Sequence, residues 1–144
     1  MKQLLFILIL LGTAGCQGTS NKKDSQAKKK QGTVKFVFQE EFHNFGPLQA
    51  GEVVVYSFAV KNSGTAGLKM KNAKSDCGCI TVDYPKEIIQ PGETGYVDVE
   101  FNSAGETGNV YKEIVMTTNA DKKEVKLAIA AHVKNELINI YSEN

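Results

Sequence analysis

The stretch EVVVYSFAVKN, residues 52–62, decides the fold class of this chain. Within it Tyr56, Phe58 and Val60 occupy every second position, and the polar Ser57 lies between them. Successive side chains of a β-strand point to opposite faces of a sheet, so this period of two predicts a strand with one apolar and one polar face. Antiparallel sheets commonly pack one such face on a core and leave the other in water.

The same alternation recurs on both sides of this stretch. Its apolar members are Val34, Phe36 and Phe38; Leu68 and Met70; Ile80, Val82 and Tyr84; Val97, Val99 and Phe101; and Val125, Leu127, Ile129, Ala131 and Val133. Polar segments separate the runs, and Pro91-Gly92 supplies the fixed φ and then the permissive φ of a type II turn. About seven short strands at this spacing predict an all-β protein, an antiparallel β-sandwich over residues 34–134.

One segment also fits a helix. Residues 119–133 contain Ala, Lys and Glu throughout and could be drawn as a capped helix. The alternation of Val125, Leu127, Ile129, Ala131 and Val133 is unbroken, however, and favours a strand.

Residues 1–15 resemble a secretory signal peptide, with a charged start, the apolar run Leu4–Leu11 and small residues after it. The apolar run is far shorter than the roughly 20 residues that span a bilayer. Ala14-Gly15 before Cys16 resembles the cleavage box of bacterial lipoproteins, in which the cysteine becomes the first mature residue and carries lipid chains. The alternative is a plain secretory signal with an incidental cysteine. The lipoprotein resemblance implies a membrane anchor on Cys16 in the cell envelope, facing the periplasm or cell surface at the outer membrane.

Residues 16–33 comprise that cysteine and a polar, Lys-rich segment that cannot bury enough apolar surface to fold, so we expect a flexible tether. All 17 basic residues of the chain are Lys. From residue 34 onward 11 Lys face 15 Asp and Glu, and this mildly acidic body argues against a nucleic-acid partner. Residues 135–144 are expected to be a C-terminal tail or a short extra strand.

Cys77-Gly78-Cys79 is the one stretch whose chemistry looks reactive. Residues two apart on a strand lie about 6.5–7 Å apart at Cα, the upper limit for a disulfide, and Gly78 lets the backbone tighten. The alternatives are a local disulfide, a metal site, thiol–disulfide exchange and two inert thiols. If the strand that holds Ile80 and Val82 extends back through the cysteines, both sulfurs point away from the core face and are reachable by solvent.

His43 is the weak candidate for a third metal ligand, or for a base beside Cys77 or Cys79. It lies just before an expected Gly46-Pro47 turn. The alternative is a loop histidine whose neighbours Phe42 and Phe45 do the packing. His132 alternates with core residues and is expected to be exposed, and the acidic pair that includes Glu40 is expected to be a solvated edge.

The chain resembles the bacterial family called domain of unknown function 1573. The residues that carry the resemblance are Phe45-Gly46, Gly51, Phe58, Asn62 with Gly64, Leu68, Cys77-Gly78-Cys79, Pro91-Gly92-Glu93, Val99 with Phe101, Gly108 and Asn119. The resemblance implies an immunoglobulin-like fold and an envelope location, and it implies no activity.

The leading hypothesis is therefore a non-enzymatic, lipid-anchored envelope protein whose immunoglobulin-like domain binds another protein or supports envelope structure. It needs no cofactor, and no small-molecule substrate is evident. The alternative is a thiol-based protein that handles metal or electrons through Cys77 and Cys79. Surface glycan binding is disfavoured, because the aromatic residues are mostly assigned to core faces.

Overall fold

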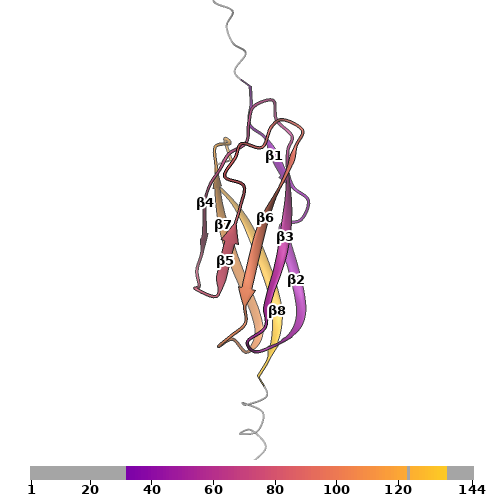
Figure 1. The fold of residues 1–144 in the computed structure, drawn as a ribbon, viewed down its shortest axis with the longest axis vertical. Helices are drawn as coiled ribbons and strands as arrows, with labels where there is room; N and C mark the ends of the chain where they lie inside the picture. The colour runs from indigo at the N-terminus through magenta and orange to yellow at the C-terminus, as the bar shows by residue number, and fades with distance from the viewer. Residues whose placement is uncertain (1–31, 123, 136–144) are drawn as a thin grey trace, which may run out of the picture.

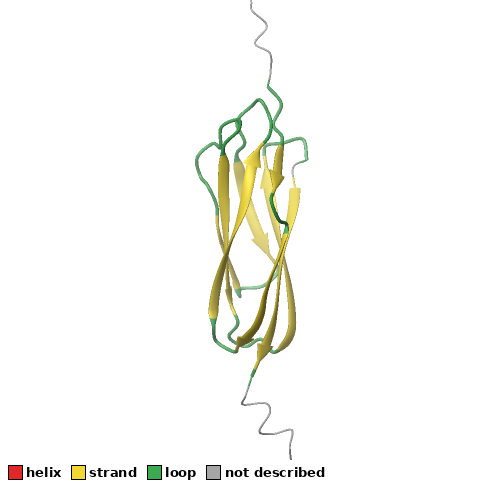
Figure 2. Ribbon diagram, turned by 90° about the vertical axis from the view of Figure 1, so that its right-hand side faces the viewer, coloured by secondary structure: helices red, strands yellow, loops and turns green. Residues whose placement is uncertain are grey.

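The structure is a computed structural model that describes residues 32–135 except residue 123. This part of the chain forms eight β-strands in two packed four-stranded sheets (Figures 1 and 2). The expected signal peptide, most of the tether, and the segment 136–144 lie outside the described residues. Among the residues described, no helix long and apolar enough to cross a membrane was found.

The first sheet has the strand order β1-β3-β6-β5, and all its neighbours run antiparallel. Its strands are β1 (Phe36–Phe38), β3 (Val53–Asn62), β6 (Thr94–Asn102) and β5 (Ile80–Asp83). The second sheet has the order β2-β8-β7-β4. Its strands are β2 (Phe42–Gln49), β8 (Glu124–Lys134), β7 (Gly108–Thr118) and β4 (Met70–Ser75).

The prediction of purely antiparallel sheets is wrong for one pair, because β2 runs parallel to β8. β1 and β2 are one stretch that passes from the first sheet to the second without reversing direction (Figure 1). The expected Gly46-Pro47 turn is also wrong, since both residues lie inside β2 at a shift in register between Asn44 and Pro47. A proline is tolerated there because an edge strand or bulge does not need its N–H.

The core lies between the two sheets and contains the residues that the alternation assigned to it. Phe58, Val97, Val99 and Phe101 are completely buried. The apolar positions of β8 are buried as well, which confirms that this segment is a strand: Val125, Leu127, Ile129, Ala131 and Val133. The turn prediction at Pro91-Gly92 is confirmed by the positive φ of Gly92 and by the bond from the Glu93 N–H to the Gln90 carbonyl at 3.0 Å.

At each edge of the sandwich the chain crosses from one sheet to the other. Residues 39–41 link β1 to β2 at one edge, and residues 76–79 link β4 to β5 at the other. Each crossing strand is short and covers only part of its neighbour. β1 pairs with β3 at Val60–Asn62 alone, and β2 pairs with β8 only from Ala128 onward.

Candidate functional site

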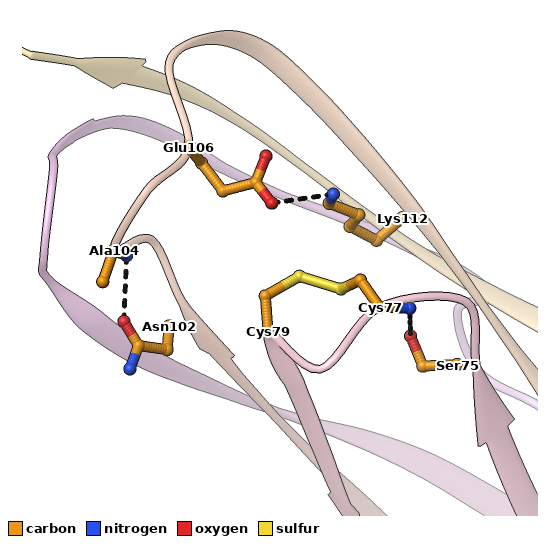
Figure 3. The surroundings of a disulfide bond; sticks show 7 residues. All are labelled: Ser75, Cys77, Cys79, Asn102, Ala104, Glu106 and Lys112. Atoms are coloured by element: carbon orange, nitrogen blue, oxygen red, sulfur yellow. Dashed lines mark hydrogen bonds and ion pairs between the residues drawn. A yellow bond between two sulfur atoms is a disulfide. The ribbon is translucent and has the colours of Figure 1, made fainter.

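Cys77 and Cys79 form a disulfide in the turn between β4 and β5 (Figure 3). Their Cα atoms are 5.2 Å apart, which is less than the distance of about 6.5–7 Å between residues i and i+2 of a strand. The distance is shorter because β5 begins only at Ile80, so the two cysteines lie in a turn. The premise that this strand extends back through the cysteines is therefore wrong. Both residues are half-buried and pack against the hydrophobic core. The disulfide thus joins the two ends of a crossing turn at the border of the core.

The surroundings of the disulfide are held by hydrogen bonds and one ion pair. The Cys77 N–H donates to Ser75 Oγ at 3.4 Å, and the Asn102 N–H donates to the Cys79 carbonyl at 2.9 Å. Lys112 Nζ lies 2.9 Å from Glu106 Oε1, with the two side chains 18% and 25% exposed. Figure 3 shows this pair on the β7 side of the disulfide. The Asn102–Cys79 bond ties the crossing turn to the end of β6, and the ion pair joins the β6–β7 loop to β7.

The structure does not bring His43 to the cysteine pair. His43 lies in β2, at the edge of the sandwich opposite to the β4–β5 crossing, rather than in a loop (Figure 1). Its ring stacks on Tyr56, with centroids 3.6 Å apart and planes 7° apart, and it meets the edge of Phe45 at 4.7 Å. The imidazole is thus a packing element that joins β2 of one sheet to β3 of the other.

Glu40 has a partner that the sequence did not indicate. Its Oε2 accepts a hydrogen bond of 2.8 Å from the Tyr56 hydroxyl, 16 residues along the chain. This bond, and to a lesser extent burial and the carboxylate charge, raise the pKa of Tyr56 above its ordinary value of 10.0. No sequence signal could have found the pair, because the β1–β2 crossing brings it together. His132 is exposed, as predicted, and its Nδ1 lies 2.8 Å from Asn109 Oδ1.

Among the described residues three aromatic side chains lie outside the core and the others pack in or against it, so the prediction that the aromatic residues mostly face the core is confirmed. Phe42, Tyr96 and Tyr111 are 50%, 58% and 59% exposed. Phe45 packs against the core, whereas Phe42 stacks on Tyr111 with ring centroids 6.4 Å apart. Within residues 32–122 and 124–135, no group of three or more His, Cys, Asp or Glu side chains is placed to hold a metal ion.

The two sheets pack around one core, and the chain passes from one sheet to the other at each edge. This arrangement is an immunoglobulin-like β-sandwich, with a disulfide at one corner. The chain belongs to the family described as a protein of unknown function, DUF1573, whose model matches residues 36–133. No curated protein matches the chain significantly.

Solved structures show the same fold at low sequence identity. A protein of unknown function from Porphyromonas gingivalis W83 is 15% identical with a TM-score of 0.59, and the match covers 70% of this chain and 46% of that one. The PapD-like domain 7 of human CEP192 is 11% identical with a TM-score of 0.60, covering 72% and 87% of the two chains. The secreted serine protease VesC from Vibrio cholerae is 11% identical with a TM-score of 0.52, covering 74% and 24%.

Proposed function

We propose that this protein is a lipid-anchored component of the bacterial cell envelope whose sandwich is a non-enzymatic binding or structural module. The observation that carries the proposal is that the side chains that could do chemistry are already in contact with other groups of the fold. The cysteine pair, His43, His132 and Glu40 each have a partner inside the fold. Large apolar side chains, in contrast, lie exposed on the strands: Val37, Phe42, Val53, Val55, Tyr96 and Tyr111. Where such side chains are contiguous, as Phe42 and Tyr111 are in their stacked pair on the second sheet, they are typical of interaction sites.

The anchor is proposed from the sequence before the sandwich. The signal-like residues 1–15 end at Cys16, and a Lys-rich segment separates this cysteine from β1. β1 begins at one end of the sandwich and β8 finishes at the opposite end (Figure 1). An anchor on Cys16 therefore attaches the sandwich to the membrane through the end at which β1 begins, and the β2–β3 and β6–β7 turns lie at the opposite end.

The anchor is tested in bacteria that express the full chain and are fed an alkyne-labelled fatty acid. We expect the label on the wild-type protein and the protein in the membrane fraction. The variant Cys16→Ala should lose both, because it removes the acylated thiol. A matched control, Cys77→Ala with Cys79→Ala, keeps Cys16 and should remain labelled. An unlabelled wild-type protein in the soluble fraction contradicts the proposal.

A further inference from the structure

The crossings at the two edges leave four stretches of central strand that the described chain pairs on one side only; we call these the open half-edges. They are residues 53–58 of β3 and residues 124–127 of β8 at the β1–β2 crossing. At the β4–β5 crossing they are residues 94–97 of β6 and residues 108–113 of β7. Unpaired strand edges attract further strands, and proteins usually block them with a charge, a proline, a bulge or a covering loop.

Three of the open half-edges carry such a block. The β5–β6 loop packs against the half-edge of residues 94–97 from the inner face at Gly95: a Cβ added there would lie 2.5 Å from Ile89 Cδ1 and 3.1 Å from Pro85 Cγ. Residues 108–113 carry Lys112 on the face that points between the sheets, paired with Glu106. Residues 124–127 carry two exposed charges, one of them Lys126.

The open half-edge of β3 differs from the other three. Residues 53–58 (VVVYSF) contain no charge and no proline, and their pairing with β6 is regular. Val53 and Val55 are 54% and 56% exposed. β-Branched and aromatic residues are the types most enriched in strands. This segment is therefore prepared to pair with a further strand.

The backbone groups of this half-edge point outward at odd-numbered residues. Farther along β3 the Ala59 carbonyl accepts a bond from the Gln39 N–H on the β1 side, whereas the Glu52 carbonyl accepts one from Ser103 on the opposite side. Because the direction alternates along a strand, the N–H and C=O groups of residues 53, 55 and 57 face the open edge. An added strand can therefore form a regular ladder of backbone hydrogen bonds with β3.

The charges beside the half-edge indicate what such a strand carries. On the outer face Ser57 pairs with Asp98 and Val55 with Glu100, and Asp98 in turn pairs with Asp83 of β5. A strand added to β3 would lie about 10 Å from β6, since neighbouring strands are about 4.8 Å apart. Lysine or arginine side chains on that strand can lie over Ser57 and Val55 and bring their charge close to these carboxylates.

We infer that the open half-edge of β3 binds an extended segment of another protein, with apolar residues facing inward and Lys or Arg facing the acidic outer face. The inference rests on the proposed function of a binding module and names its site and the chemistry of its partner. Other occupants fit the charge less well. The C-terminal residues 136–144 contain two Glu and no basic residue, and a second copy of the first sheet would bring a second acidic row on its β6.

The test measures amide hydrogen exchange of the full chain in detergent micelles, with NMR as the readout. The probe is a capped peptide in which valine and lysine alternate. The control peptide has glutamate in place of each lysine. We expect the lysine peptide to slow exchange at Val53, Val55 and Ser57. At ninety per cent saturation exchange proceeds only from the free tenth, so the slowing is about tenfold. The glutamate peptide should leave these amides unchanged.

Two sets of variants separate the backbone from the charges. Val55→Pro removes an N–H that points to the open edge and should abolish the slowing, whereas Val55→Thr keeps this N–H and should retain it. The charge variant Asp98→Asn with Glu100→Gln leaves the strands intact and should remove the preference for lysine over glutamate. Equal binding of both peptides to the wild type, or binding without protection of these amides, overturns the inference.

Other occupants give different results, and each of them overturns the inference. If the three amides are already protected without peptide and lose protection on dilution, a second copy occupies the edge. If they lose protection when residues 136–144 are deleted, the chain's own C-terminal segment does. Neither result affects the labelling of Cys16, so the proposed anchor and this site fail independently.

Discussion

The side-chain amide of Asn62 donates a hydrogen bond of 2.8 Å to the carbonyl oxygen of Ile89, 27 residues along the chain. The same nitrogen donates to the Ala66 carbonyl at 2.9 Å, and Oδ1 accepts a bond from the Gly64 N–H at 2.9 Å. Asn62 is completely buried. One polar side chain therefore joins the β3–β4 connection to the β5–β6 connection at one end of the sandwich.

We predict that Asn62→Ala lowers the free energy of unfolding by about 2–4 kcal/mol, because it removes three hydrogen bonds and leaves the volume of a completely buried side chain unfilled. The measurement is urea unfolding followed by circular dichroism. The neighbouring Ser63 is exposed, and Ser63→Ala should change the same quantity by less than about 0.5 kcal/mol. Equal effects of the two substitutions would show that the Asn62 bonds contribute little.

The disulfide should contribute modestly to stability, since Cys77 and Cys79 are only two residues apart and close a very short loop. We expect Cys77→Ala with Cys79→Ala to lower the free energy of unfolding by about 1.5 kcal/mol, the cost in unfolded-chain entropy for such a loop. Reductant should lower the stability of the wild type by a similar amount and leave the variant unchanged. Unfolding of the variant at room temperature without denaturant contradicts this prediction.

Tyr56 should titrate above the ordinary tyrosine pKa of about 10, because its hydroxyl donates to Glu40. The folded pKa is raised, so the stabilisation is fully present below about pH 10 and is lost as the pH rises through the folded pKa. Glu40→Gln removes the carboxylate and should lower the pKa of Tyr56 toward 10. The measurement is the pH dependence of the Tyr56 ring carbon shift by NMR.

The control for this titration is Glu41→Gln, which alters the exposed neighbour of Glu40 and should leave the Tyr56 titration where it is. If both variants shift the Tyr56 titration equally, general charge rather than the hydrogen bond sets its pKa.

Lys112 should protect the open half-edge of β7 from self-association. Lys112→Val replaces the half-buried charge between the sheets with an apolar, β-branched side chain, so we predict concentration-dependent association that the wild type lacks. Sedimentation velocity across a concentration series measures it. Lys112→Arg keeps the charge and should behave as the wild type does. If Lys112→Val stays as monodisperse as Lys112→Arg, Lys112 does not protect this edge from association.

Much of the fold could be predicted from local patterns. Alternation assigned the inward faces of β3, β6 and β8, and Pro91-Gly92 marked a turn that the structure confirms. β2 was missed because a bulge at Gly46 and Pro47 interrupts its period and because its proline suggested a turn. Whether the cysteines belong to the strand of Ile80 and Val82 could only be stated as a condition, because the sequence does not show where β5 begins.

The sequence by itself determined the class of fold and which side chains face the core. That information is local: it depends on a period of two and on the φ preferences of a few residues. Only the tertiary structure decided which strands become neighbours. It brought the Asn62 amide to the Ile89 carbonyl, the His43 ring to the Tyr56 ring and the Tyr56 hydroxyl to Glu40. It also left residues 53–58 of β3 paired on one side only in the described chain. The pairing of the strands and the crossings at the two edges fix these relationships. Each of them joins residues that are far apart in the sequence, so no local pattern predicts it.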